Sequence, residues 1–292
     1  MKNEKEVKCM ILVTGSNGQL GFDVTKELQK RKLEYVGSIR SDFDITNYDE
    51  VEGYILKLKP ECIIHCASYT AVDKAEDEKE ICYKINVLGT ENIAKVCKKV
   101  NAKMIYISSD YVFDGSGNMP HQINEAANPL SVYGKSKYKG ELKVKEYLDK
   151  YFIVRTSWVF GTNGNNFVKT MLRLGNERSS INVVSDQIGS PTYTVDLAKL
   201  LCDMALSEKY GTYHGTNEGF CSWAQFAQEI MRIANLDCKI NYIKTEEYKT
   251  KAVRPLNSRL SKENILENGF EMLPCWESGL ERYLSNLNKK SN

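Results

Sequence analysis

The chain has 292 residues, of which 42% are hydrophobic and 27% charged, as is typical of a globular protein with a substantial core. Its 40 basic and 38 acidic side chains leave a formal net charge of +2, which gives no support for nucleic-acid binding, because such proteins concentrate positive charge on one face. No segment approaches the roughly 20 apolar residues of a membrane span, so we expect neither a membrane nor a nucleic-acid partner.

Apolar runs of strand length alternate with helix-length segments through the first half of the chain. We predict strands at residues 9–14, 34–39, 62–67, 104–108 and 152–156, and helices at residues 19–31, 48–58, 80–100 and 132–149. Continuous apolar strands that alternate with helices favour a parallel sheet covered on both faces. The predicted fold is therefore α/β, with a Rossmann-type, doubly wound parallel sheet.

The alternation becomes irregular after Gly161, where "INVVSDQIGSPTYT" and "GTYHGTNEGFCSW" predict short strands joined by long loops. We predict a nucleotide-binding domain over residues 1–160. Residues 161–292 are predicted to form mainly a smaller C-terminal substrate-binding lobe, and a return of the chain to the first domain is left open.

Three glycines, Gly15, Gly18 and Gly21, follow the first predicted strand and begin the first predicted helix. Glycines at this spacing also occur in plain turns. In a strand–loop–helix context, however, they remove side chains that would block a pyrophosphate, and the helix N-terminus then holds the anion. This motif predicts a dinucleotide site.

The end of the second predicted strand, "GSIRSDFDIT", decides which dinucleotide is expected. A carboxylate there would hold the ribose hydroxyls of NAD, whereas a guanidinium favours the 2′-phosphate of NADP. Arg40 comes first, so NADPH is favoured; Asp42 could serve a ribose, which leaves NADH open.

Tyr133 and Lys137 lie four residues apart in a predicted helix for which Ser131 is a candidate N-cap. A cation beside a phenol lowers the pKa of the phenol, and we expect Lys137 to do so for Tyr133. A surface Tyr–Lys pair is the plain alternative. Ser109 ends the fourth predicted strand, at the edge where ligands bind in such sheets. Together the three side chains predict a carbonyl-reduction site above a nicotinamide.

These motifs resemble the extended short-chain dehydrogenase/reductase family, whose members act on nucleotide sugars. The resemblance extends from about residue 9 to residue 285 and is carried in order by "GSNGQLG", "SYTAVDKAE", "SSDYVFDG", "NPLSVYGKSK", "RTSWVFG", "GNNFVKTML", "DQIGSPTYTVDLA", "YHGTNEGFCSWAQFA" and the "RP" at Arg254–Pro255.

The resemblance implies roles for individual residues. The catalytic residues would be Ser109, Tyr133 as the acid, and Lys137 as its ribose-binding partner. Cofactor-binding residues would be Gly15, Asn17, Gly18, Gln19, Leu20, Arg40, Asp44, Ile45, Ala67, Ser68, Tyr69, Asn86, Tyr133 and Lys137. Substrate-binding residues would be Val72, Asp73, Ser109, Trp158, Asn165, Asn166 and Arg254.

Some of these residues have plainer interpretations. Trp158 follows a buried strand and could be a core residue, Arg254 could be merely solvated, and the pair Asn165–Asn166 could cap the following helix. The sequence also departs from the family, since His65 and Cys66 stand where relatives have Asn and Ala.

The resemblance implies NADPH-dependent reduction of the C4 ketone of a nucleotide-linked deoxysugar. A reductase, epimerase or dehydratase for another nucleotide sugar is an alternative, as is a non-catalytic regulatory subunit of the same fold. Some relatives form Mg²⁺-bridged dimers for which Asp23 could supply a ligand. The second ligand is not evident, so a homodimer is left open and no metal is predicted.

Nine cysteines include no C-x-x-C pair and lie mostly in apolar runs, which predicts reduced, buried thiols of a cytoplasmic protein. The three histidines are far apart in the sequence, which disfavours a zinc site.

Overall fold

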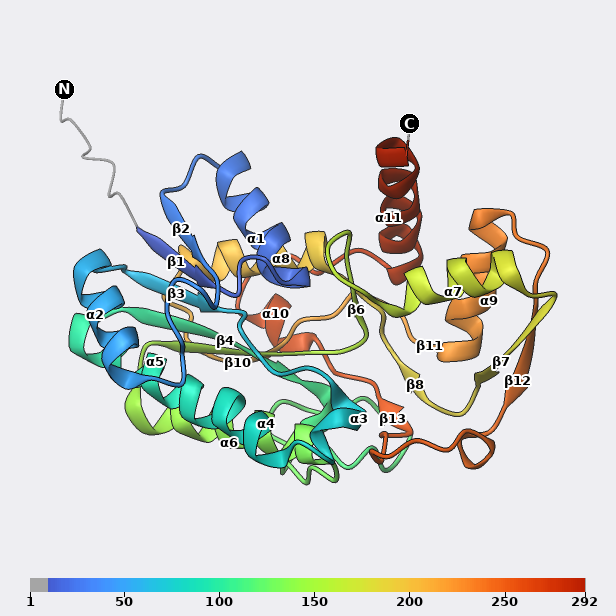
Figure 1. Ribbon diagram of the computed structural model, residues 1–292, viewed down its shortest axis with the longest axis horizontal. Coiled ribbons are helices and arrows are strands. Elements are labelled where there is room, and N and C mark those ends of the chain that lie inside the picture. Colours follow the sequence, from blue (N-terminus) through green and yellow to red (C-terminus); the bar gives the residue numbers. More distant parts are fainter. Residues whose placement is uncertain (1–9, 292) are drawn as a thin grey trace.

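The structure, a computed structural model, describes residues 10–291 and the side chains of residues 10–287. Cys9, the predicted start of the first strand, lies outside these residues. Figure 1 shows a sheet with helices on both faces, and beside it a smaller lobe of helices and short strands. Within residues 10–291, no helix is both long and apolar enough to cross a membrane.

The central sheet has six parallel strands, and its strand order reverses beside the first of them. In spatial order the strands are β2 (Tyr35–Ser38), β1 (Ile11–Thr14), β3 (Cys62–His65), β4 (Lys103–Ser109), β5 (Tyr151–Thr156) and β10 (Gly211–His214). The predicted α/β fold with a parallel sheet is confirmed. Because β2 and β3 lie on opposite sides of β1, a crevice opens at the carboxyl end of β1, where such sheets bind ligands.

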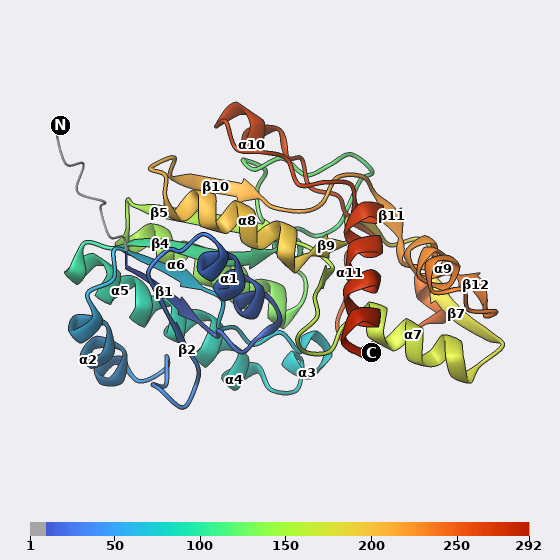
Figure 2. The same cartoon turned by 90° about the horizontal axis from the view of Figure 1, so that it is seen from above.

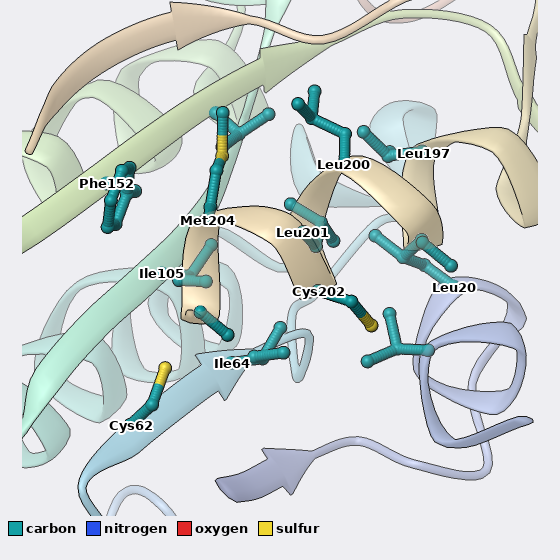
Figure 3. Packing of buried hydrophobic residues seen from close by; sticks show 14 of the residues in the cluster. Leu20, Cys62, Ile64, Ile105, Phe152, Leu197, Leu200, Leu201, Cys202 and Met204 are labelled. Carbon is teal, nitrogen blue, oxygen red and sulfur yellow. The ribbon is translucent and has the colours of Figure 1, made fainter. Parts of the chain in front are cut away.

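Helices cover both faces of this sheet, which explains why its strands are apolar throughout. Helices α1 (Gln19–Lys30) and α8 (Thr194–Ala205) pack on the face that carries Ile11 and Val13. Figure 3 shows Leu200, Leu201 and Met204 of α8 directed at strand residues of this core. On the opposite face, Leu12 packs with residues of three other helices: α2 (Tyr48–Leu58), α5 (Thr90–Val100) and α6 (Val132–Tyr147). Figure 2 shows these two layers from above.

The helix predicted over residues 80–100 is interrupted by a wider turn. It consists of α4 (Lys79–Tyr83), a π-helical segment (Lys84–Gly89) and α5. Asn86 lies in the π-helical segment, and its carbonyl accepts a hydrogen bond from Thr90 Oγ1 at 2.8 Å. Such turns often mark functional positions in helices. The short helix α3 (Val72–Ala75) precedes α4.

The smaller lobe has its own hydrophobic core, to which Phe160, Phe226 and Tyr283 contribute. Its helices are α7 (Phe167–Glu177), α9 (Trp223–Ala234) and α11 (Trp276–Ser291), and α10 (Glu263–Glu267) lies beside β10 of the sheet. Its short strands are β6 (Val159–Phe160), β7 (Ser180–Val184), β8 (Ile188–Gly189), β9 (Thr192–Tyr193), β11 (Cys221–Ser222), β12 (Lys239–Ile243) and β13 (Asn257–Ser258). Although they follow residue 161, α8 and β10 pack in the sheet-forming part. The division at residue 160 stays a prediction.

Helix α6 is fixed to the sheet by a buried ion pair. Arg155 of β5 donates from Nε and Nη2 to the two oxygens of Glu141, each at 2.8 Å, and Ser108 of β4 donates to Glu141 Oε1 at 2.6 Å. The Glu141 side chain is fully buried. Close packing next to it requires Gly140, since a Cβ there would lie 2.8 Å from the carbonyl oxygen of Asn86. These contacts set the height of α6 over the carboxyl ends of β4 and β5.

Replacing Glu141 by Leu should destabilise the protein by about 3–5 kcal/mol, because it leaves the Arg155 guanidinium buried without its partner. The double variant E141L/R155M should recover part of that loss. Urea unfolding measures both effects, with Glu146→Gln as a control, because Glu146 lies on the same helix with its side chain 51% exposed. Equal stability of the E141L and E146Q variants would contradict the anchoring role.

Candidate active site

A cleft of about 550 Å³ opens at the carboxyl ends of β1, β2 and β3. Gly15 has a φ of +65°, and a Cβ there would lie 2.8 Å from the backbone nitrogen of Ala67, so the loop after β1 packs against the end of β3 only with glycine. Predicted cofactor residues that line the cleft are Gly15, Asn17, Gly18, Arg40, Asp44, Ile45, Ala67 and Ser68. Its volume and the helix N-terminus at Gly18 fit a nucleotide with phosphate groups.

The end of β2 supplies a cation to this cleft. Arg40 and Asp44 both line it. The Asp42 carboxylate instead accepts a hydrogen bond from the backbone nitrogen of Ile39 at 2.7 Å. Hydrogen bonds from Thr46 hold the pKa of Asp44 below its ordinary value. The arrangement therefore favours a cation at the position where a 2′-phosphate would lie, in keeping with the preference predicted for NADPH.

Other predicted cofactor residues make contacts with the protein itself. Gln19 Nε2 donates to the carbonyl of Val159 at 3.0 Å, and Leu20 lies in the core of the sheet. Asn86 Oδ1 accepts from Ser68 Oγ at 2.9 Å and from the backbone nitrogen of Tyr69 at 2.8 Å. These contacts show residues that shape the loops around the cleft. Their contact with a cofactor stays a prediction.

Ser109, Tyr133 and Lys137 come together beside the cleft. Ser109 ends β4, and its hydroxyl lies close enough to the Tyr133 phenol to lower the pKa of that phenol. Lys137 lies one turn after Tyr133 on α6, and its Nζ donates to Ser68 Oγ at 3.2 Å. The predicted N-cap is confirmed, because Ser131 Oγ accepts from the backbone nitrogen of Gly134 at 3.0 Å. Ser109 and Tyr133 thus lie together where strand β4 ends, and Lys137 reaches the cleft wall at Ser68.

Burial sets the protonation of this cluster. It raises the pKa of Tyr133 well above its ordinary value, and the hydrogen bond with Ser109 offsets only part of this effect. Burial also lowers the pKa of Lys137 to about 7. Our expectation that Lys137 lowers the pKa of Tyr133 is therefore wrong for this structure. The loss of water around the phenol is the largest effect on its pKa, and Asp110 raises that pKa further.

Two carboxylates near these residues were not predicted from the sequence as part of the site. Asp110 Oδ1 accepts from Ser109 Oγ at 2.9 Å, and burial raises the pKa of Asp110 to about 6 although a hydrogen bond with Ser258 lowers it. Glu141 raises the pKa of Lys137 and so opposes the effect of burial. The sequence does indicate that Glu141 lies near Lys137, because it follows Lys137 by four residues and so falls on the same face of the predicted helix.

Several of the predicted substrate residues have partners within the protein. Arg254 forms a two-pronged ion pair with Asp73, at 3.0 and 2.6 Å. Asn166 caps α7 by accepting from the backbone nitrogen of Lys169 at 3.0 Å, which confirms the capping interpretation. Trp158 is half-buried and stacks on Trp223. The two remaining residues, Val72 in α3 and the exposed Asn165 before α7, have solvent-accessible surface. Contact with a substrate stays a prediction for all of them.

His65 and Cys66, the two residues that differ from the family pattern, have different environments. His65 is buried, with its Nδ1 2.8 Å from Thr14 Oγ1, and burial lowers its pKa to about 3, so it is neutral near pH 7. Cys66 lines the cleft. Asp23, considered above as a Mg²⁺ ligand, accepts a hydrogen bond from Thr194 Oγ1. Among residues 10–291 no three His, Cys, Asp or Glu side chains are arranged to hold a metal ion.

Comparison with known proteins gives concordant matches over nearly the whole chain. The RmlD substrate binding domain family matches residues 9–289. The chain is 40% identical over 288 residues to a dTDP-4-dehydrorhamnose reductase from Aggregatibacter actinomycetemcomitans. This match covers 93% of this chain and 97% of that protein. It is 38% identical over 274 residues to the spore coat polysaccharide biosynthesis protein SpsK from Bacillus subtilis, covering 94% and 96%. A crystal structure of dTDP-4-dehydrorhamnose reductase from Bacillus anthracis in complex with NADP matches with a TM-score of 0.93 and 44% identity. This match covers 96% of this chain and 99% of that one.

Lys137 should make stability depend on pH. Its pKa is about 7 in the folded protein against an ordinary value of 10.5, so between these values the unfolded chain binds more protons than the folded one. The free energy of unfolding should therefore rise with pH from about 7 to 10, by at most about 1.4 kcal/mol per pH unit, relative to a Lys137→Met variant. Below pH 7 the free energy of unfolding relative to the Lys137→Met variant should level off at its lowest value.

Urea unfolding of both proteins at several pH values measures this difference, in which the other titrating groups cancel to first order. A difference that stays flat from pH 7 to 10 would show that Lys137 retains an ordinary pKa in the folded protein.

Proposed function

The chain belongs to the RmlD substrate binding domain family, and from this premise we propose that it reduces the C4 ketone of dTDP-4-dehydro-L-rhamnose to give dTDP-L-rhamnose. The observation that carries the proposal is that Ser109 and Tyr133 lie close together, and that Lys137, one turn after Tyr133, donates to Ser68 in the wall of the cleft formed by the glycine loop. A purely regulatory subunit would not need all three side chains together.

NADPH is the cofactor that the cleft fits best. The loop from Gly15 to Gly18 would hold the pyrophosphate, Arg40 the 2′-phosphate, and Lys137 the nicotinamide ribose. When bound, NADPH supplies the hydride for the ketone carbon. Arg40 is exposed and lines the cleft.

Tyr133 acts as the proton donor to the ketone oxygen. Because burial raises its pKa, the phenol is fully protonated at neutral pH, which is the form that reduction consumes. An alkoxide is far more basic than any phenolate, so the proton still moves downhill. Ser109 lies near the same phenol, and its hydroxyl, which here donates to Asp110, would donate to the ketone oxygen by exchanging that hydrogen bond.

Lys137 restores the proton to Tyr133. A pKa of about 7 lets its amine release and regain a proton with little cost near neutrality. Ser68 and Asn86, which are hydrogen-bonded to each other behind the lysine, fix the position of its Nζ. The lysine thereby connects the reacting phenol to polar groups at the cleft wall.

The substrate contacts belong to the same proposal. Trp158 would stack on the sugar ring, and Val72, Asn165 and Asn166 would line its surroundings. Arg254 would reach the diphosphate only if its ion pair with Asp73 is exchanged for phosphate oxygens.

The proposed function also includes a cellular compartment, the absence of a nucleic-acid partner and an oligomeric state. The eight cysteines within the described residues are free thiols, which suits the reducing cytoplasm. We also infer that the protein acts without nucleic acid, and we retain a homodimer as an expectation.

Replacing Tyr133 by Phe should lower kcat for the keto sugar nucleotide by about 10²–10⁴-fold, because the general acid is removed. Binding of NADPH, followed by fluorescence titration, should persist. Tyr138→Phe on the same helix is the matched control and should retain activity, since Tyr138 packs beside Val112 and Phe113.

The assay follows NADPH absorbance with a panel of 4-keto-deoxysugar nucleotides that differ in sugar and base. A Y133F variant that binds NADPH and turns over at the wild-type rate would refute the mechanism. Turnover of another panel member in preference to dTDP-4-dehydro-L-rhamnose would refute the substrate.

Replacing Arg40 by Ala should raise the KM for NADPH by about tenfold or more, because one charge-assisted hydrogen bond to a phosphate contributes roughly 1.5–3 kcal/mol. The KM for NADH should change little, which makes NADH the internal control. Equal effects on both cofactors would show that Arg40 does not contact the 2′-phosphate.

A further inference from the structure

Two indoles far apart in the sequence stack face to face at the junction of the sheet and the smaller lobe. The ring centroids of Trp158 and Trp223 are 3.7 Å apart, with 14° between the planes. Trp158 follows β5, and Trp223 is the first residue of α9, whose N-cap is Ser222. The capping box at this helix end, in which Ser222 and Gln225 exchange hydrogen bonds, fixes the start of α9 and hence the base of the Trp223 side chain.

The backbone of Trp158 is strained. Its φ is +50°, which is unusual for a bulky residue and costs on the order of 1–3 kcal/mol. The conformation is held by a hydrogen bond from the backbone nitrogen of Thr192 to the carbonyl of Trp158 at 3.1 Å. The edge of the indole packs on Gly189, where an added Cβ would lie 2.8 Å from Trp158 Cε2. Such strain at a residue beside a site points to a functional constraint.

A series of close approaches leads from this indole towards Ser109. The Cβ added at Gly189 would also lie 3.0 Å from the Cβ of Ser258, and Ser258 is close enough to Asp110 to lower the pKa of that carboxyl. Asp110 is in turn hydrogen-bonded to Ser109 at 2.9 Å. A short series of neighbouring residues therefore leads from the Trp158 ring to Ser109, which lies near Tyr133.

We propose that Trp223 is a positioning residue for the reduction: it covers one face of the Trp158 indole and fixes its plane, so that the sugar ring stacks on the other face with its ketone toward Ser109 and Tyr133. This inference rests on the proposed function. Trp223 does not itself contact the substrate and acts only through Trp158.

A packing role alone would give different results from a positioning role. Trp223 also contacts Phe167, at 4.6 Å between centroids, and lies at the margin of the core of the smaller lobe. Leu at position 223 would keep most of the apolar volume but remove the flat surface, whereas Phe would keep a flat surface. Comparing the two substitutions therefore separates ring stacking from burial.

The experiment compares the wild type with Trp223→Leu, Trp223→Phe, Trp158→Leu and the double variant W158L/W223L. Trp276→Phe is the matched control, because Trp276 is buried in the same lobe with its ring against Phe226. Steady-state kinetics give KM and kcat for the keto sugar nucleotide and KM for NADPH. Far-ultraviolet circular dichroism detects the exciton couplet of the stacked indoles.

The W223L variant should raise the KM for the sugar nucleotide by about five- to tenfold, the size of an aromatic stacking contribution, and leave the KM for NADPH unchanged. W223F should recover most of this loss. The double variant should be no worse than W158L, because both substitutions act through one surface. The couplet should vanish in every variant that removes Trp158 or Trp223 and persist in W276F.

Wild-type kinetics in W223L, additive losses in the double variant, or a parallel rise in the KM for NADPH would each overturn the positioning role. Absence of turnover by the wild type with every sugar nucleotide would instead refute the proposed function, and the positioning role with it. Active wild type with an unaffected W223L variant refutes the inference alone.

Discussion

The buried carboxylate of Glu141 is the constraint on which the geometry of the site depends. Helix α6 carries both Tyr133 and Lys137, and Glu141 follows them on the same face of the helix. Arg155 and Ser108 fix that carboxylate to two neighbouring strands, and Ser108 directly precedes Ser109. One ion pair thus sets the height of the helix over the very strand that supplies the third member of the cluster. A buried ion pair contributes little net stability but is costly to break, which suits it to fixing a position.

The same burial that makes the anchor effective determines the proton chemistry. Removing water from α6 keeps Tyr133 protonated and lowers the pKa of Lys137 to about 7, while the charge of Glu141 keeps that pKa from falling further. Reduction needs a phenol that carries its proton and an amine that exchanges protons near neutral pH. A phenol ionised by a fully charged neighbouring lysine would suit it less well. The shift that the sequence analysis predicted for Tyr133 had the wrong sign because neighbours can be inferred from spacing, whereas the depth of burial cannot.

Local patterns made much of the fold and part of the site predictable. Apolar runs, the glycine loop and the four-residue spacing of Tyr133 and Lys137 are encoded within short stretches of sequence. The ion pair of Glu141 with Arg155, the π-helical segment at Asn86 and the pairing of Asp73 with Arg254 are not. Each depends on how separate elements pack, so no single-sequence pattern marks it. The Trp158–Trp223 stack joins residues 65 positions apart and became visible only once β5 and α9 were placed.

The return of the chain to the sheet explains how a site assembled from two lobes keeps its geometry. Gln19, at the start of α1, donates to Val159 and accepts from Asn166 Nδ2 at 3.0 Å, while Thr194 at the start of α8 donates to Asp23 of α1. These bonds join the helix of the glycine loop directly to the chain that leaves β5 for the smaller lobe. A cofactor held by that loop and a sugar held near Trp158 would therefore share one rigid support. Their relative placement would then follow from the packing of α1 on α8 and from the hydrogen bonds of α1 to the chain around β6.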